Sequence, residues 1–263
     1  MRTPRPTELA VVAERVARDA VTLLVGLADQ PARGVEAKST ATDMVSDADH
    51  ASERLLRSRI AELRPDDGVL GEEGATTPGR SGLTWVVDPL DGTTNYLYRY
   101  PQWAVSVACE DSAGPVAGCV IDATRGEVFT AARGDGATLN GAPIRVSGER
   151  TLSRALIGTG FAYDAPTRVA QAAQLARLIG RVRDVRRAGS AALDLAWVAA
   201  GRLDGFYETG IRHWDWAAGR LLVLEAGGRF EAAPGPLGDD QVVTANRYLY
   251  QPLAAIVNAP LGA

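Results

Sequence analysis

Two aspartates in residues 85–95 have the spacing of a possible metal site. Asp88 and Asp91 stand three positions apart, directly after an apolar run that predicts a strand. Carboxylates at a strand end can share a hard divalent cation, because Mg²⁺ prefers oxygen ligands. Gly92, which follows them, permits a tight turn or a close approach of the backbone. Taken alone, these residues fit an Asp-Pro turn capped by Asp91 and Thr93 equally well.

The residues after Gly92 add a possible phosphate contact. Thr93 and Thr94 stand where a helix could begin, and the first backbone N–H groups of a helix have no partner within it. Beside metal ions, such N–H groups would donate hydrogen bonds to phosphate oxygens. The stretch therefore predicts metal ligands and a phosphate-binding turn side by side.

Acidic residues in three other segments stand at predicted strand ends or helix starts. Glu72 follows a short strand, Asp215 directly precedes a helix predicted over residues 216–225, and Asp49 begins another helix. Each has an ordinary alternative: a solvated turn for Glu72, an N-cap for Asp215, and a capping pattern with Ser46 for Asp49. Taken together, they stand where ligands collect in layered α/β proteins.

The charge of these acids predicts metal dependence. If Glu72, Asp88, Asp91 and Asp215 converge, the site carries about four negative charges before a substrate arrives. A phosphate dianion would then be repelled unless about two divalent cations intervened. A converged site would therefore be strictly dependent on metal.

Other catalytic patterns are weaker. Cys119 and Arg125 have the spacing of cysteine-dependent phosphatases, but the Val-Ile run between them suits a strand and not a phosphate-wrapping loop. His50 and His213 are the only histidines, so no zinc cluster is indicated. A surface or packing role is expected for His213.

The elements around these residues predict stacked helical and sheet layers. Helical periodicity covers residues 7–28, and a second helix starts near Ser46. Short β-like runs separated by turn residues fill 69–146, and strands alternate with helices from residue 155 onwards. Helices, then a mainly antiparallel sheet, then alternating α and β elements favour an α+β protein built from packed layers.

The composition sets the broad class. The 263 residues carry a net charge of −4, which gives no broad basic surface for nucleic acid. No apolar run is long enough to span a membrane, and the start has no apolar signal-peptide core. With only two cysteines and neither in a disulfide framework, we expect a reducing, cytoplasmic location.

At this point a family resemblance becomes specific. The chain resembles the inositol monophosphatase family, part of a lithium-sensitive, magnesium-dependent sugar-phosphatase superfamily. The main motifs are Gly71-Glu72-Glu73, Trp85-x-x-Asp88-Pro89-x-Asp91-Gly92-Thr93-x-Asn95, and Trp214-Asp215 before a helix that ends at Glu225-Ala226-Gly227-Gly228. Further matches are Lys38-Ser39, Asp43, Asp49, Gly136-Ala137-x-x-Asn140-Gly141 and Gly189-Ser190-Ala191.

The resemblance implies a fold and a metal site. The fold would be a layered αβαβα sandwich of the inositol monophosphatase and fructose bisphosphatase type. We expect one unit over 1–263, with sub-halves 1–150 and 151–263. About two to three Mg²⁺ ions would bind per subunit. The expected ligands are Glu72, Asp88 and the Leu90 carbonyl for the first ion, Asp88, Asp91 and Asp215 for the second, and Glu72 through water for a third.

The resemblance also implies roles in catalysis and substrate binding. Asp49 and Thr93 would orient and help deprotonate the attacking water, and Glu72 belongs to the same catalytic set. The expected substrate contacts are the backbone N–H groups of Gly92 and Thr93 toward phosphate, with Ala191, Glu208 and Asp215 toward the alcohol.

The resulting expectation is an enzyme that hydrolyses a small phosphorylated polyol. Glu208 could accept hydrogen bonds from hydroxyls, which favours myo-inositol 1-phosphate. Histidinol phosphate, fructose 1,6-bisphosphate and 3′-phosphoadenosine 5′-phosphate remain alternatives. The larger substrates usually need basic residues, for which Arg183, Arg186 and Arg187 are available, although solvent or a subunit interface is their favoured environment. A homodimer is expected, and a transcription-associated regulatory role is a lower-ranked alternative.

Overall fold

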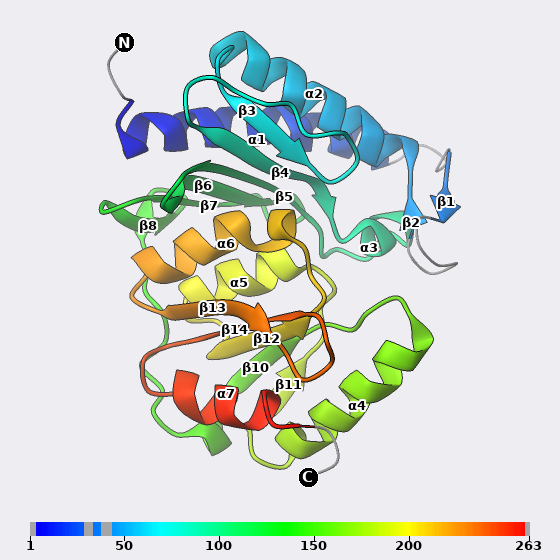
Figure 1. The fold of residues 1–263 in the computed structure, drawn as a ribbon, viewed down its shortest axis with the longest axis vertical. Coiled ribbons are helices and arrows are strands. Elements are labelled where there is room, and N and C mark those ends of the chain that lie inside the picture. Colours follow the sequence, from blue (N-terminus) through cyan, green and yellow to red (C-terminus); the bar gives the residue numbers. More distant parts are fainter. Residues whose placement is uncertain (1–3, 29–33, 38–43, 261–263) are drawn as a thin grey trace.

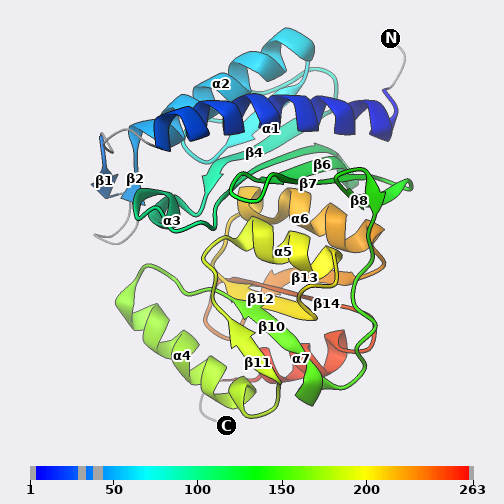
Figure 2. The same cartoon turned by 180° about the vertical axis from the view of Figure 1, so that it is seen from behind.

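Helical and sheet layers alternate through the computed structural model, which describes residues 4–28, 34–37 and 44–260. The order is helix, sheet, helix, sheet, helix (Figures 1 and 2). The expected αβαβα sandwich is therefore confirmed. Lys38, Ser39 and Asp43, which the resemblance singled out, lie outside the described residues.

The helices form the outer and central layers. They are α1 (Pro6–Ala28), α2 (Asp47–Leu63), α3 (Thr93–Leu97), α4 (Ala165–Ile179), α5 (Ala191–Ala199), α6 (His213–Glu225) and α7 (Tyr250–Val257), with one 3₁₀ turn at Leu152–Arg154. Helices α1 and α2 cover one outside face, α5 and α6 lie between the sheets, and α4 and α7 cover the other outside face (Figure 1).

The first sheet comes from the first half of the chain. Its strands, in spatial order, are β3 (Gly68–Gly71), β4 (Thr84–Asp91), β5 (Ala104–Asp111), β6 (Gly114–Asp122), β7 (Glu127–Ala132), β8 (Gly136–Leu139) and β9 (Ala142–Pro143). Strands β3 and β4 are parallel and the remaining pairs are antiparallel. A separate two-stranded pair joins β1 (Glu36–Ala37) and β2 (Met44–Val45).

The second sheet comes from the second half of the chain. Its spatial order is β11 (Asp184–Arg186), β10 (Leu156–Thr159), β12 (Gly205–Thr209), β14 (Asp240–Ala245) and β13 (Arg229–Pro234). Strand β10 runs parallel to both of its neighbours, whereas the β12–β14 and β13–β14 pairs are antiparallel. This mixture explains the alternating strands and helices in the sequence, because a parallel neighbour requires a crossover connection.

The central helices are apolar because both of their faces are covered. Helix α5 buries nearly its whole length between the two sheets, where Phe129 and Phe206 pack against the helix layer. Helix α6 lies so close to α5 that a Cβ at Gly219 would come within 2.6 Å of Leu195. Only glycine permits this approach, and it sets the separation of the two helices whose N-termini face the site.

Most predicted elements are confirmed, with shifts at their ends. The helix predicted over 216–225 begins at His213, so Asp215 lies in its first turn and not before it. Strand β13 and the short strands β8 and β9 were not predicted. Their segments are rich in Ala, Pro and Gly, which disfavour strands, and pairing with neighbouring strands overrides that weak local preference.

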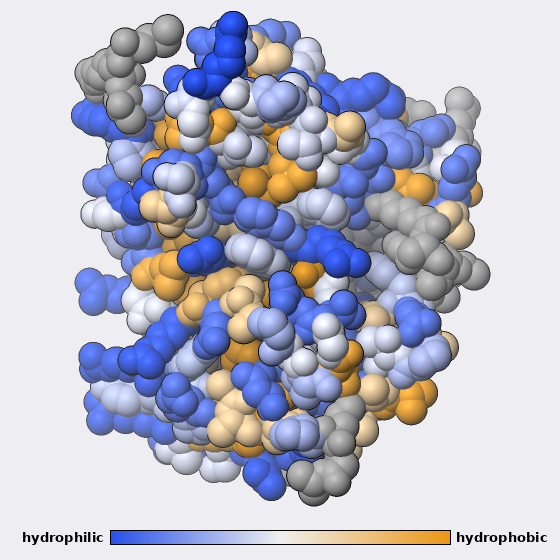
Figure 3. Space-filling model, viewed as in Figure 1, coloured by the Kyte–Doolittle hydropathy of each residue, from blue (hydrophilic) through white to orange (hydrophobic). Residues whose placement is uncertain are grey.

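None of the described helices is long and apolar enough to cross a membrane. The longest, α1, buries one stripe of small and aliphatic residues against the first sheet and leaves its other side to solvent. On the face shown in Figure 3, hydrophilic residues predominate and hydrophobic ones are scattered between them.

Candidate active site

A cavity of about 420 Å³ lies where the end of β4 meets the N-termini of α5 and α6. Its lining includes four acids from segments that are distant in sequence and were expected to converge. The predicted site residues that line it are Glu72, Asp88, Leu90, Asp91, Gly92, Thr93, Ala191, Glu208 and Asp215.

The end of β4 is bent by a bulge. Asp88 pairs with Ser106 and Asp91 with Ala104, so three steps along β4 match two along β5. Asp88 is buried, and its Oδ1 accepts a hydrogen bond from the Leu90 N–H at 3.0 Å. The bulge therefore directs neighbouring oxygen groups of this strand end into one cavity.

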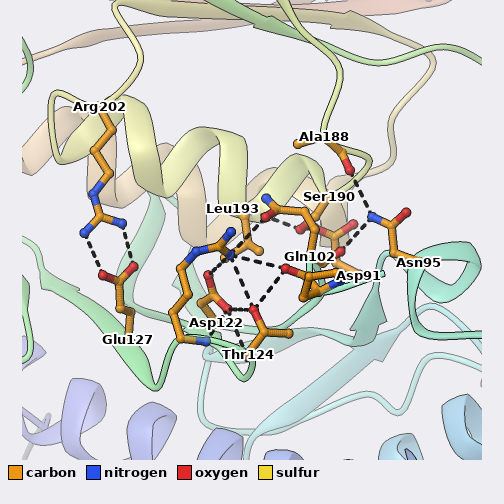
Figure 4. Close-up of polar contacts among 12 residues, drawn as sticks. Asp91, Asn95, Gln102, Asp122, Thr124, Glu127, Ala188, Ser190, Leu193 and Arg202 are labelled. Carbon is orange, nitrogen blue, oxygen red and sulfur yellow. Dashed lines mark hydrogen bonds and ion pairs between the residues drawn. The ribbon is translucent and has the colours of Figure 1, made fainter. Parts of the chain in front are cut away.

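Asp91 is held by the start of α5. Its Oδ2 accepts hydrogen bonds from Ser190 Oγ at 2.5 Å and from the Ala192 N–H at 2.7 Å. Figure 4 shows Asp91 and Ser190 side by side where the two halves of the chain meet. An anion at a helix N-terminus is stabilised by the unpaired N–H groups and the helix dipole. One carboxylate oxygen is thus fixed structurally, and the other is left for the cavity.

Gly92 connects this strand end to α3. Its φ of +92° is one that other residues rarely adopt. A Cβ there would also come within 3.0 Å of the Gln102 carbonyl oxygen and 3.2 Å of the Gly189 carbonyl oxygen. The glycine is therefore required both by the turn and by the close approach of two other segments.

The clustered carboxylates are electrostatically unfavourable without a cation. Burial raises the pKa values of Asp88 and Asp215 well above their ordinary range, and the negative charges of Glu72 and Asp91 raise both further. Burial also raises the pKa of Asp91 to about 6, against the lowering effect of its Ser190 hydrogen bond. Such a group of hard oxygen donors, mutually repelled, fits divalent cations. Within the described ranges, no group of three or more His, Cys, Asp or Glu side chains is arranged so that it could hold a metal ion, so the four acids share the cavity without forming a ligand set.

Asp49 joins the site through a threonine hydroxyl. Thr93 Oγ1 donates to Asp49 Oδ1 at 2.7 Å and lies 3.1 Å from the Leu90 carbonyl oxygen. The other oxygen of Asp49 accepts hydrogen bonds from the backbone N–H and the hydroxyl of Ser46. The capping alternative is therefore confirmed, and the other carboxylate oxygen of Asp49 contacts Thr93, with which the resemblance had paired it in a catalytic role.

The opposite wall holds a second pair of acids. Burial raises the pKa of Glu208 to about 7 and the pKa of Asp194 well above its ordinary range. Asp194 is 1% exposed, and within the described part of the chain its Oδ1 has no hydrogen-bond partner. Sequence reasoning missed Asp194. The available signal was a single acid inside an otherwise apolar helix.

Arg187 lies at the edge of the cavity, unlike the two other arginines of its segment. It lines the cavity, whereas Arg183 donates to the carbonyl of Arg154 and Arg186 pairs with Asp184. Burial raises the pKa values of Asp91, Asp194 and Glu208, and the positive charge of Arg187 opposes that rise in each. Arg187 is exposed, as was expected, but it lies at the cavity, so it can face both solvent and a bound substrate.

Comparison with known proteins places this site in a family. The model of the inositol monophosphatase family matches residues 5–260. The chain belongs to the inositol monophosphatase family. Several residues of the family motifs quoted from the sequence line the cavity, among them Glu72, Asp88, Asp91 and Asp215.

Two relatives within this family carry different names. The chain is 45% identical over 260 residues to the inositol-1-monophosphatase of Mycobacterium leprae, covering 91% of this chain and 89% of that protein. It is 40% identical over 237 residues to the Nus factor SuhB of Escherichia coli, covering 89% and 88%. Among solved structures, the extragenic suppressor protein SuhB of Bartonella henselae is similar with a TM-score of 0.89 at 35% identity, covering 97% of this chain and 100% of that one.

The residues set aside as non-catalytic have structural environments. His213 stacks on Trp216 and its Nε2 lies 3.0 Å from a carboxylate oxygen of Glu110. Cys119 is buried in β6, and burial raises the pKa of its thiol. A thiol kept neutral cannot act as a nucleophile. The strand predicted around Cys119 is confirmed.

Proposed function

We propose that this protein hydrolyses a small phosphate monoester in a magnesium-dependent reaction, with myo-inositol 1-phosphate as the favoured substrate. The observation that carries the proposal is the convergence of Glu72, Asp88, Asp91 and Asp215 on one cavity. The negative charges of Glu72 and Asp91 help to raise the pKa values of Asp88 and Asp215, as expected for carboxylates that lie near one another. The family supports the same reading, because its relatives include proteins named inositol-1-monophosphatase.

The residues that would hold the ions are those expected from the sequence. Glu72, Asp88 and the Leu90 carbonyl would bind one Mg²⁺, and Asp88, Asp91 and Asp215 another. When bound, the ions supply charge neutralisation at the phosphoryl group and lower the pKa of water. Since phosphoryl transfer depends mainly on positioning and electrostatics, the protein needs no covalent nucleophile.

The Asp49–Thr93 pair is suited to orient and deprotonate the attacking water. Because the Thr93 hydroxyl donates to Asp49, a lone pair of its oxygen is free to accept a hydrogen bond from water. The water oxygen would attack phosphorus while the bond to the alcohol oxygen breaks, and its proton would move toward Thr93 and Asp49. A pair so placed is typical of general base catalysis.

The far wall favours a neutral polyol over a second phosphate. In the described part of the chain, the positive charge of Arg187 lowers the pKa values of Asp91, Asp194 and Glu208, and these three acids outnumber it. A second phosphate would therefore meet a net negative charge, which disfavours a bisphosphate. Hydroxyl groups, in contrast, could accept from Arg187 and donate to Glu208. A donor and an acceptor suited to hydroxyl groups support inositol 1-phosphate over the other phosphate esters that remain as alternatives.

A phosphate-release panel tests this proposal. Purified protein is given inositol 1-phosphate, histidinol phosphate, fructose 1,6-bisphosphate and 3′-phosphoadenosine 5′-phosphate, each with and without Mg²⁺. We expect metal-dependent turnover that is fastest on inositol 1-phosphate and lost in Asp91→Asn. Turnover of any substrate at near-normal rate by Asp91→Asn or Asp88→Asn would contradict the metal assignment.

A regulatory role is a second candidate because some relatives are named Nus factor SuhB. That name supports an association with transcription that does not require catalysis. Pull-down of RNA polymerase by the wild type and by Asp91→Asn alike would favour it. Binding by neither would leave the enzyme as the only supported function.

We also infer that the protein is a cytoplasmic homodimer that uses about two to three Mg²⁺ ions per subunit. Both cysteines are free and buried, which agrees with a reducing compartment. The dimer follows from the family resemblance. Light scattering and a metal titration test the dimer and the ion number.

A further inference from the structure

The side chain of Asn95 links two segments behind the cavity. From the short helix α3, its Nδ2 donates to the carbonyl oxygens of Gln102 at 2.7 Å and Ala188 at 2.9 Å, and lies 3.3 Å from that of Gly189. Figure 4 shows Asn95 reaching Ala188 next to the Asp91–Ser190 contact. An amide nitrogen has two hydrogens, so both are used by backbone groups of other segments.

One of these segments leads directly to Asp91. Gly189 is followed by Ser190, whose hydroxyl donates to Asp91 Oδ2, and the Ala192 N–H donates to the same oxygen. Fixing the carbonyls of Ala188 and Gly189 therefore fixes the donors that orient Asp91. The loop can approach this closely because residue 189 is glycine: a Cβ there would come within 3.0 Å of the Asn95 Nδ2.

The other segment lies on the strand next to Asp91. The carbonyl of Gln102 precedes β5, and Ala104 of β5 pairs with Asp91. The same carbonyl is one of the two that approach Gly92. Asn95 thus connects the segment before β5 with the loop before α5, next to the end of β4 that carries Asp91.

We propose that Asn95 is a positioning residue for the metal site, acting through the loop before α5 to fix the orientation of Asp91. The inference rests on the proposed function in one respect, namely that Asp91 is a metal ligand. Groups that orient a metal ligand without touching the metal typically change metal affinity by about 10- to 100-fold when they are removed.

The chain offers a matched control in Asn246. Its Nδ2 donates to the carbonyl oxygens of Ser147 at 2.9 Å and Glu149 at 2.8 Å, joining segments in the same way. It is buried and is not among the cavity-lining residues. Removing either amide takes the donor from two backbone carbonyls. Asn246→Ala also removes the acceptor of the Tyr248 and Leu249 N–H groups, so it is the harsher change to stability, but only Asn95 lies beside the proposed metal site.

The test measures Mg²⁺ binding by calorimetry, together with melting temperature and turnover, for wild type, Asn95→Ala and Asn246→Ala. We expect both variants to lose thermal stability, but only Asn95→Ala to lose Mg²⁺ affinity, by about tenfold or more. In Asn95→Ala, kcat should fall at subsaturating Mg²⁺ and recover partly at high Mg²⁺, with little change in KM for the ester. If Asn95→Ala does not fold, Asn95→Ser, which keeps one donor, is measured in the same way.

The possible failures are distinct. Wild-type Mg²⁺ affinity in the Asn95 variant, or an equal loss in Asn246→Ala, would overturn the positioning role alone. Wild-type protein that binds Mg²⁺ but releases no phosphate would refute the proposed function, while the binding comparison would still decide the role of Asn95. Wild-type protein that binds no Mg²⁺ would overturn both.

Discussion

Replacing Asp91 with asparagine should stabilise the metal-free protein while abolishing its activity. Burial raises the pKa of Asp91 from its ordinary 3.8 to about 6, so at pH 7 the folded state holds an unfavourable carboxylate. Each pKa unit corresponds to about 1.4 kcal/mol, which gives a cost of about 2 to 3 kcal/mol. The asparagine oxygen can still accept from Ser190 and Ala192, so this cost is removed without loss of those contacts.

The sign of the pH dependence follows from which state binds the proton. Between about pH 4 and 6, Asp91 is protonated in the folded protein and ionised in the unfolded chain, so stability falls as pH rises through this window. Asp91→Asn removes this part of the fall. Its gain over wild type should therefore be absent below about pH 4, grow up to about pH 6, and stay constant above it.

The assay is urea denaturation of both proteins from pH 4 to 8, with chelator and with Mg²⁺. We expect Asp91→Asn to be more stable than wild type at pH 7 in chelator. Mg²⁺ should stabilise the wild type more than the variant, because the variant keeps only the proposed ligands of the first ion. A variant that is less stable than wild type in chelator at pH 7 would refute the electrostatic reasoning. Equal stabilisation of both proteins by Mg²⁺ would refute the role of Asp91 as a ligand.

Three further substitutions test other parts of the site. Thr93→Val removes the hydroxyl that contacts Asp49, so kcat should fall by about 100-fold or more with Mg²⁺ affinity unchanged in calorimetry; a normal kcat would contradict the proposed proton path. Glu208→Gln should raise KM for inositol 1-phosphate by about tenfold but leave an aryl phosphate unaffected, and an equal change on both would exclude hydroxyl recognition. Arg187→Ala should show the same substrate-dependent KM change, whereas Arg186→Ala, which loses only its pair with Asp184, should resemble wild type.

The fold was largely predictable from the sequence because its layers have distinct periodicities. The long apolar stripe of α1 and the short alternating runs of the first sheet are local signals. Strand β13, in contrast, is mostly exposed, has one large apolar residue, and exists because β14 pairs with it. Its existence depends on a partner in the folded chain and could not be predicted from its own residues. The division into sub-halves 1–150 and 151–263 stays a prediction.

The site was predictable where residue type alone limits the chemistry. Acids at a strand end and at a helix start indicated metal ligands, although Asp215 lies in the first turn of α6 and not before it. The sequence could not predict which side chains of a loop lie at the cavity. Nothing local distinguishes Arg187 from Arg186, yet only Arg187 lines the cavity, because the path of the loop before α5 depends on contacts with distant residues such as Asn95. The catalytic and ligand roles themselves stay predictions.

Diffraction from crystals soaked in Mn²⁺ tests the central claim most directly, since anomalous scattering locates the ion without any assumption about activity. The proposed site predicts anomalous peaks within coordination distance, about 2.0 to 2.3 Å, of oxygens of Glu72, Asp88, Asp91 and Asp215. Peaks confined to other parts of the surface, with the four carboxylates facing a cavity that holds only water, would contradict it.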